Sequence, residues 1–499
     1  MDKGLAELTA RNVEIFDLQR AASLLSWDQM TYMPPGGAEA RARQLAMLQR
    51  MAHERSVDPA LGRLLERLRP LEKRLPHDSN DASIIRVTRR GYEIATKVPI
   101  EWATRYFKHQ AESYEAWVKA RPKNDFKSVL PYLEKTVQFS QEYSEFFPGY
   151  DHPLDPLINN FDFGLKAKKV KGIFKELRSE LVPLVKKISK SEQVDASILV
   201  GDFPEAAQEE FGKMLAAELG YDFQRGRLDR TPHPFTTGFS LGDVRITTRY
   251  NRRALGDALF STIHESGHAM YEQGVDPALD GTPLGGGSGM SLHESQSRLW
   301  ENNVGRSLPF WRHYYPKLVK AFPRFKKAKA EEFYRAINKV EPSLIRVEAD
   351  EVTYGLHIMV RFDIEDGLIN DKVRVKELPE VWNGRYESDL GILPPNDSMG
   401  VMQDVHWFTG LVGYFECYAL GNLLSAQIFD AAVKKKPAIP KEIGQGKFTT
   451  LHSWLVDNIY RHGNKFTTME ILERTKLGDM KVAPFVAYLK KKYGDIYGF

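Results

Sequence analysis

The sequence predicts a mainly α-helical protein that has one small β-sheet beside a central helix. Apolar residues recur every three or four positions through most of the first 220 residues and again after residue 290, which is the period of helices that bury one face. Residues 243–250 instead alternate apolar and polar side chains with a period of two. Hydrophobic residues make up 42% and charged residues 27% of the chain, so a sizeable core can form.

The first helices are amphipathic. One stripe between residues 5 and 25 consists of Leu5, Leu8, Ile15, Leu18, Ala22 and Leu25. A cleaner stripe follows at Val170, Ile173, Phe174, Leu177, Leu181, Leu184 and Ile188. We expect Pro183 to kink or end that second helix, because proline cannot donate a helical hydrogen bond.

A strand, a helix and a glycine-rich loop follow one another in the centre of the chain. Val244 and Ile246 alternate with polar neighbours, which predicts a half-buried strand over 243–250. Helical periodicity returns over 251–271, and Gly274 is a suitable stop. Residues 281–289 are rich in glycine and proline and predict a mobile active-site loop. A phosphate-binding loop is disfavoured, since the Lys-Ser/Thr pair and the preceding strand are missing.

The charge balance argues against two classes of partner. With 70 basic and 66 acidic side chains and a formal net charge of +4, the chain has no general field that attracts nucleic acid or an anionic membrane. No stretch of eighteen apolar residues occurs. The single Cys417 and a start without a secretory signal predict a cytoplasmic, reducing compartment.

Residues 264–268 read His-Glu-Ser-Gly-His, the H-E-x-x-H pattern. Residues four apart on a helix lie on one face about 6 Å apart, so His264 and His268 can bind one ion. Glu265 lies about 100° round the helix, where it can act as the base on a metal-bound water. The pattern also arises by chance, but here it falls in a helix, after a strand and before the glycine-rich loop. We therefore expect one divalent metal per chain.

A catalytic zinc needs a third protein ligand and an open position. The metzincin pattern would place that ligand at position 274, where Gly274 stands. Our choice is Glu294, just beyond the glycine-rich loop. Glu272 competes, but it is more than two helical turns from His264. Glu301 is not excluded by geometry, and it could instead orient a histidine from outside the ligand shell.

Further motifs occur in order along the chain: Leu25-Ser-Trp-Asp28, His233-Pro-Phe235, Asp243-Val-Arg-Ile-Thr247, His293-Glu-Ser-Gln296, Ile345-Arg-Val-Glu-Ala-Asp350 and Gly400-Val-Met-Gln-Asp-Val-His-Trp407. With the metal helix, they resemble the carboxypeptidase Taq family of metallocarboxypeptidases over nearly the whole chain. The resemblance implies a mostly helical fold with a deep groove, a homodimer, zinc or cobalt, and Glu294 rather than Glu301 as ligand. It also implies broad removal of single residues from peptide C-termini. Glu416-Cys417 departs from the pattern, in which Pro-Thr is expected.

Hydrolysis passes through a tetrahedral oxyanion that needs a donor besides the metal. His406, Tyr414 and Tyr418 are the candidates. Both tyrosines could equally be buried aromatics bonded to the backbone. His406 lies inside one of the motifs quoted above.

A carboxypeptidase must also recognise a free terminal carboxylate, which calls for a cation with paired donors. Arg346 is our choice, with Arg245 and Arg298 as rivals; the ordinary alternative for each is a structural ion pair. The remaining residues expected to line the substrate groove are His233, Pro234, Phe235 and Gln403.

Residues 1–499 are expected to form a single catalytic domain, which could divide into two lobes, with the motifs concentrated in 231–430. The predicted function is that of a metal-dependent carboxypeptidase that acts on peptides with a free C-terminus. An endo-acting oligopeptidase is the alternative. A catalytically dead peptide-binding protein is a third reading, and the intact Glu265 argues against it.

Overall fold

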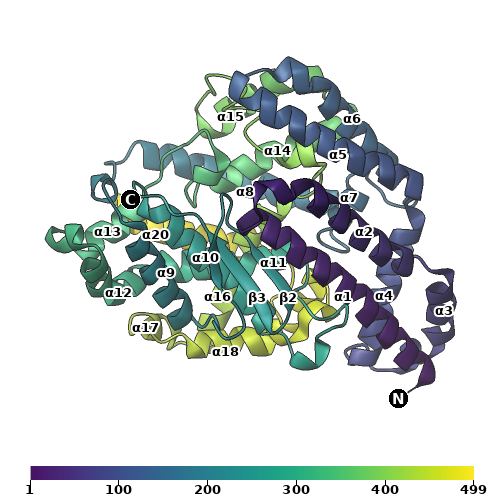
Figure 1. The fold of residues 1–499 in the computed structure, drawn as a ribbon. Coiled ribbons are helices and arrows are strands. Elements are labelled where there is room, and N and C mark those ends of the chain that lie inside the picture. Colours follow the sequence, from purple (N-terminus) through teal and green to yellow (C-terminus); the bar gives the residue numbers. More distant parts are fainter. Residues whose placement is uncertain (1) are drawn as a thin grey trace.

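The computed structural model describes residues 2–499, and helices make up most of it, as the periodicity predicts (Figure 1). The chain opens with helices that pack on one another, namely α1 (Lys3–Thr31), α2 (Ala38–Ser56), α3 (Pro59–Arg74) and α4 (Asn80–Lys97). These are followed by α5 (Ile100–Ala120), α6 (Phe126–Glu145), α7 (Asp155–Asn159), α8 (Ala167–Ser189) and α9 (Glu205–Leu219).

Helix α8 tests the cleaner of the two predicted stripes. All seven of its predicted apolar residues, Val170 to Ile188, are buried, which confirms the helical period. The helix does not end at Pro183 but continues to Ser189. Tertiary packing of this apolar face therefore outweighs the missing hydrogen bond at the proline.

The small sheet lies between α1 and the metal-motif helix α10 (Leu255–Gln273) (Figure 1). It consists of β1 (Leu228–Arg230), β2 (Thr236–Ser240) and β3 (Asp243–Thr248) in the order β1-β3-β2. β1 runs parallel to β3 and β2 antiparallel to it. Val244 and Ile246 are buried while Arg245 between them is half-buried, as the alternation predicts.

Helix α10 begins four residues later than predicted, at Leu255. Ala254 instead forms an isolated antiparallel bridge with Val200, a distant partner that local periodicity cannot indicate. At the other end Gly274 stops the helix as expected, and its N–H bonds to the carbonyl oxygen of Met270 at 2.9 Å. The glycine-rich segment 281–289 forms turns and bends up to residue 286 and is irregular over 287–289.

The rest of the chain is also mostly helical. It comprises α11 (Met290–Arg298), the π-helical segment η5 (Leu299–Gly305), α12 (Leu308–Ala321), α13 (Ala330–Ile337), η7 (Arg346–Glu348), α14 (Tyr354–Ile369), α15 (Leu378–Leu390), η9 (His406–Thr409), α16 (Glu416–Lys435), α17 (Ile439–Ile443), α18 (Thr449–Asn458), η10 (Tyr460–Lys465), α19 (Thr468–Arg474) and α20 (Val482–Tyr497). Of these elements, α11, η5 and η10 contact α10.

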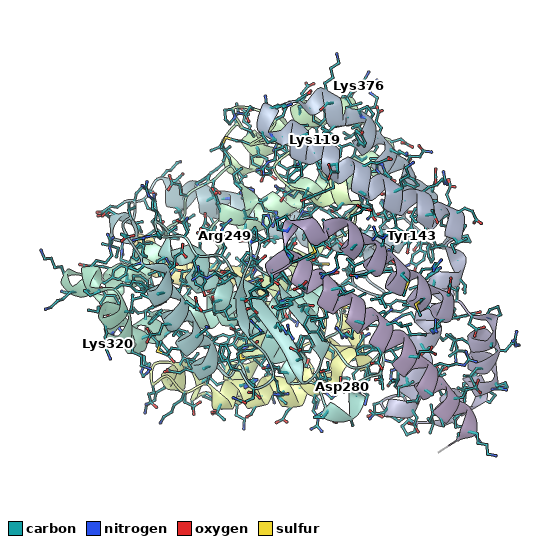
Figure 2. The ribbon with its side chains drawn as sticks, in the orientation of Figure 1. Lys119, Tyr143, Arg249, Asp280, Lys320 and Lys376 are labelled. Atoms are coloured by element: carbon teal, nitrogen blue, oxygen red, sulfur yellow. The ribbon has the colours of Figure 1, made fainter. Side chains whose placement is uncertain are left out.

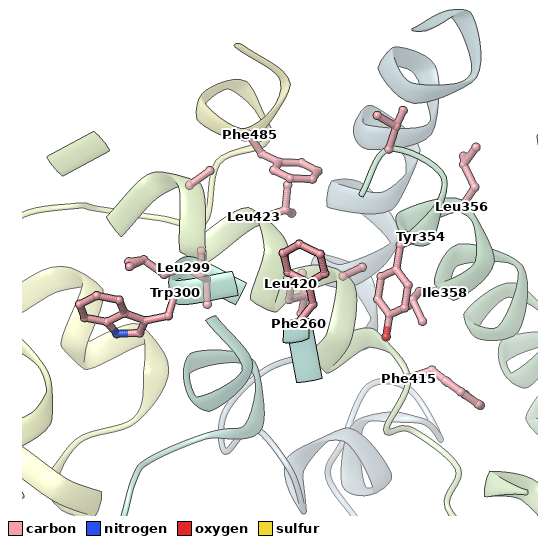
Figure 3. Packing of buried hydrophobic residues seen from close by; sticks show 14 of the residues in the cluster. Phe260, Leu299, Trp300, Tyr354, Leu356, Ile358, Phe415, Leu420, Leu423 and Phe485 are labelled. Atoms are coloured by element: carbon pink, nitrogen blue, oxygen red, sulfur yellow. The ribbon is translucent and has the colours of Figure 1, made fainter. Parts of the chain in front are cut away.

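Two apolar clusters hold these elements together. The larger one joins α10, α14, α16 and α20, and Figure 3 shows Phe260, Tyr354, Leu420 and Phe485 from these helices within it. A smaller cluster ties α1, α3 and α4 to the loop beside the metal helix. Exposed lysines such as Lys119, Lys320 and Lys376 extend from the periphery (Figure 2). None of the helices in residues 2–499 combines the length and apolar character needed to cross a bilayer.

Candidate metal centre and active site

The three side chains predicted as metal ligands converge on one point. His264 and His268 project from α10, Glu294 projects from α11, and one ligand atom from each lies within 4.8 Å of the other two. The Oε2 atom of Glu294 is 3.5 Å from Nε2 of His264 and 3.2 Å from Nε2 of His268. Two imidazoles and a carboxylate are the ligand set of catalytic zinc sites and also suit cobalt.

Two glycines set the spacing of the helices that carry these ligands. A Cβ atom on Gly267 of α10 would lie 2.7 Å from backbone atoms of Gln296 and Ser297 on α11. A Cβ atom on Gly421 of α16 would lie 2.5 Å from Cγ of Glu294. Helix α11, which carries Glu294, thus packs closely against both α10 and α16, an approach that only glycine permits at these two positions.

Glu301 contacts Nδ1 of His264, whereas Nε2 of the same ring faces the ligand cluster. Its Oε2 atom is 2.9 Å from Nδ1 of His264, so the carboxylate accepts the Nδ1–H and leaves Nε2 free to bind an ion. Burial alone would raise the pKa of Glu301, but the charge of Arg298 and the contact with His264 hold it at about 2. This geometry matches the orienting role considered for Glu301 rather than the ligand role.

A second chain of contacts fixes His268. Nδ1 of His268 is 2.6 Å from Nδ1 of His293, and Nε2 of His293 is 2.7 Å from Oε1 of Glu272. Glu272 can only accept, so His293 donates from Nε2, accepts at Nδ1, and directs the lone pair of His268 Nε2 toward Glu294. Glu272 also accepts from the N–H of Gly287 at 2.9 Å. This series of contacts, from His268 through His293 to Glu272, therefore ends at the glycine-rich loop.

Sequence reasoning missed this role of His293 and Glu272. Two local signals were available: Glu272 stands four residues after His268 on the same helical face, and His293 directly precedes Glu294. It also missed Thr236 of β2. The Thr236 hydroxyl donates to Oε2 of Glu265 at 2.5 Å and so fixes the orientation of the predicted base.

The environment of Glu265 suits proton transfer. Its side chain is buried, and burial raises the pKa of Glu265 above its ordinary value, opposed by His264 and by the bond from Thr236. A raised pKa brings a carboxyl group closer to neutral pH, where it exchanges protons more effectively.

The candidate oxyanion donors form one cluster at the start of α16. Nε2 of His406 lies 3.3 Å from the Tyr418 hydroxyl, and the rings of His406 and Tyr414 stack with centroids 5.9 Å apart. Burial and the charge of Arg346 lower the pKa of His406 to about 3. Burial raises the pKa of both Tyr414 and Tyr418. At neutral pH the imidazole is therefore neutral, and both phenols keep the proton they can donate.

Arg346 is buried in an ion-paired cluster. Its Nε and Nη2 atoms donate to Oδ1 of Asp404 at 3.0 and 2.8 Å, while Nε of Arg361 donates to Oδ2 of Asp404 at 2.6 Å. Two guanidinium groups thus share one carboxylate, which leaves one positive charge in excess. Gln403 supports this cluster, because its Oε1 atom accepts from Arg361 at 2.8 Å and from the backbone N–H of Arg346 at 2.9 Å.

The two rival arginines, Arg298 and Arg245, form ion pairs with other carboxylates. Arg298 donates to Oε1 of Glu294 at 2.7 Å. Arg245 is bonded to both oxygens of Asp243, at 2.8 and 2.7 Å, and lies 4.4 Å over the ring of Trp27. The structure therefore ties the Leu25-Ser-Trp-Asp28 motif to the strand motif. His233 is exposed, Pro234 and Phe235 are half-buried, and all three directly precede β2.

Comparisons with known proteins agree with the mostly helical fold and with the family that the sequence motifs resemble. A model of the family described as carboxypeptidase Taq (M32) metallopeptidase matches residues 7–493. The chain is 40% identical over 494 residues to thermostable carboxypeptidase 1 of Thermus thermophilus, with 96% of each protein covered. It is 37% identical over 500 residues to carboxypeptidase 1 of Bacillus subtilis, covering 98% of this chain and 99% of that one. The crystal structure of the M32 carboxypeptidase from Deinococcus radiodurans superposes with a TM-score of 0.96 and 42% identity over 100% of both chains.

Proposed function

Because this chain belongs to the carboxypeptidase Taq (M32) family of metallopeptidases, we propose that His264, His268 and Glu294 hold one divalent ion, zinc or cobalt, beside the base Glu265. Metallocarboxypeptidase activity on peptides follows from the family. The observation that carries the proposal is the convergence of the three ligand atoms within 4.8 Å, next to a buried carboxyl group oriented by Thr236.

The chain's own residues account for the proton transfers. A bound divalent ion would polarise the scissile carbonyl group and make water more acidic. Glu265 accepts the proton of the attacking water and delivers it to the departing amine. The bond from Thr236 keeps one oxygen of Glu265 occupied, so the other faces the reacting water.

Charge that develops on the carbonyl oxygen needs a donor already in position. We assign this role to the cluster of His406, Tyr414 and Tyr418, in which both phenols keep their protons at neutral pH because burial raises their pKa. The cluster is in place before substrate binds, because Tyr418 is tied to His406.

The terminal carboxylate of the substrate is assigned to Arg346. Burying that carboxylate is tolerable only beside a cation, and the surplus positive charge shared with Arg361 around Asp404 supplies one. Removing one member of such a pair costs about 2 to 5 kcal/mol, or roughly thirtyfold to several thousandfold in kcat/KM. Arg346→Ala should lose activity in that range and keep its metal.

The test compares four versions of one peptide: unblocked, N-acetylated, C-terminally amidated and doubly blocked. The zinc-loaded protein should cleave the first two well and the amides poorly. In Arg346→Ala, and in the charge-conserving Arg346→Lys, the ratio of acid to amide cleavage should shrink. Arg245→Ala is the matched control, because Arg245 is bonded to Asp243 rather than to a proposed ligand, and it should keep both its metal and its ratio of acid to amide cleavage. Rapid internal cleavage of the doubly blocked peptide would contradict the exopeptidase assignment and favour an oligopeptidase.

Further properties are proposed on the family resemblance and composition. These are broad specificity for the released residue, a homodimer, a single catalytic domain over residues 1–499, and a cytoplasmic, reducing compartment suited to the lone buried Cys417.

A further inference from the structure

A series of cavities leads away from the metal helices. The first, of about 370 Å³, is lined by Thr236, Glu272 and His293, which are side chains that support the metal centre. It shares Gly287, His293 and Asn464 with a second cavity of about 470 Å³. The two cavities therefore adjoin at the glycine-rich loop.

The second cavity continues into a third, of about 670 Å³, whose walls are strongly basic. The shared wall consists of Arg90, Ile94, Asn159, Phe163 and Thr467. Two acidic side chains line the third cavity, against six cationic ones: Arg69, Arg86, Arg89, Arg90, Lys97 and Lys465. Helix α4 supplies most of these cations.

Among these six cations Arg90 stands out because it is half-buried and, within residues 2–499, its side chain makes no ion pair and no hydrogen bond; Lys97 also makes neither, but it is exposed. Arg89 is paired with Glu72, and Arg86 donates to two backbone carbonyl groups. Arg90 instead lies over the ring of Phe163, with its guanidinium carbon 4.3 Å from the ring centroid. A guanidinium stays charged in proteins, so the wall between the two cavities holds a half-buried charge that no carboxylate of residues 2–499 contacts directly, although Glu470 lines the third cavity and acts on it at longer range.

Such a charge is suited to an anion that arrives with the substrate. We propose that Arg90 forms a subsite for an acidic side chain, aspartate or glutamate, at a peptide position upstream of the bond that is cut. This inference rests on the proposed function, because it takes the cavities as the route of the upstream part of the peptide.

The terminal carboxylate is not the occupant of this subsite. Only one residue separates that carboxylate from the cut bond, and one residue spans at most about 3.6 Å. The path from the metal helices to Arg90 passes through a whole cavity. Arg346 also sits in a different part of the fold, packed against Tyr354 of α14 and Tyr418 of α16.

The experiment uses N-acetylated hexapeptides that have a free C-terminus and otherwise uncharged side chains. Either glutamate or glutamine is placed in turn at each position before the C-terminal residue. For the zinc-loaded protein, kcat/KM should favour glutamate over glutamine at one or more positions by about threefold to thirtyfold. Added sodium chloride should reduce this ratio. Arg90→Gln should bring it close to one, and Arg90→Glu should favour lysine at the same position. Arg63→Gln, an exposed arginine on α3 outside the cavity wall, is the control and should keep the ratio.

Binding separates this proposal from the proposed function. The same peptides, fluorescently labelled, are titrated against the Glu265→Gln protein and its double variant with Arg90→Gln, with anisotropy as the readout. An Arg90-dependent preference for glutamate without any hydrolysis by the parent would keep the subsite and reject the carboxypeptidase assignment. Hydrolysis with equal kcat/KM for both peptides at every position, or a preference that survives Arg90→Gln, would overturn the subsite.

Discussion

Replacing Glu416 with glutamine should stabilise the protein at neutral pH, and the gain should grow as the pH rises. Glu416 is the first residue of α16 and is fully buried. Neither of its carboxylate oxygens has a hydrogen-bond partner among the described residues. Burial, and then the negative charge of Glu365, raise the pKa of Glu416 well above its ordinary value.

The sign and size of the effect follow from proton linkage. A glutamate in the unfolded chain titrates near about 4.3, so above that pH the folded state binds more protons than the unfolded state at Glu416. The contribution of Glu416 to the free energy of unfolding of the parent is therefore largest below the unfolded pKa, and it falls as the pH rises toward the folded pKa. Each pH unit in this window costs about 1.4 kcal/mol. From pH 5 to pH 7, the advantage of Glu416→Gln should widen by up to about 2.7 kcal/mol.

The assay is denaturation of both proteins by urea at several pH values, with the metal concentration held fixed because binding also stabilises the folded state. Glu331→Gln is the control. Glu331 is exposed and its pKa is lowered by the bond from Arg312, so its replacement should show no widening gain with pH. A difference between Glu416→Gln and the parent that stays constant from pH 5 to pH 7 would refute the reasoning, because it would mean that Glu416 ionises equally in both states.

Three further outcomes are expected. Glu265→Gln should keep its metal, measured by plasma mass spectrometry, yet lose several orders of magnitude in turnover, because an amide cannot accept the proton of water. Glu294→Ala should empty the site while Glu301→Gln only weakens it; an empty site in the second variant and a full one in the first would exchange the two roles. Glu272→Gln should reduce metal affinity by about tenfold to a hundredfold in a competition titration with a chelator, and unchanged affinity would show that the chain through His293 does not support His268.

The parts of the fold that can be predicted are those determined by the spacing of residues close together in the sequence. The stripe on α8 could be read because each of its apolar residues lies on one helical face and is buried. The start of α10 could not be read, since Ala254 pairs with Val200 more than fifty positions earlier in the chain. Continuation through Pro183 was likewise decided by packing rather than by the proline itself.

The residues of the candidate site also fall into two groups, those that local spacing predicts and those that only the fold brings together. Within the ligand set, the spacing of His264 and His268 is a property of one helix, so the sequence could indicate it. The cluster round Arg346 depends on Asp404, 58 positions away, and spacing gives no sign of such a pair. The contact between His268 and His293 joins two helices separated by the glycine-rich loop, so local spacing could point to Glu272 and His293 as candidates but not to their contact with His268.

The close approach of backbones at Gly267 and Gly421 bears on the radius of the ion that the site accepts. The backbone of α10 at Gly267 lies against the backbone of α11 at Gln296 and Ser297, and the backbone of α16 at Gly421 lies against the side chain of Glu294, so the spacing between this carboxylate and the two imidazoles depends on how closely the helices pack. Ca²⁺ requires six to eight oxygen ligands at about 2.3–2.6 Å, a shell that three fixed ligands, two of them nitrogen, cannot provide. Small tetrahedral ions fit such a frame with little rearrangement, so we expect discrimination against larger ions to be a property of the helix packing itself.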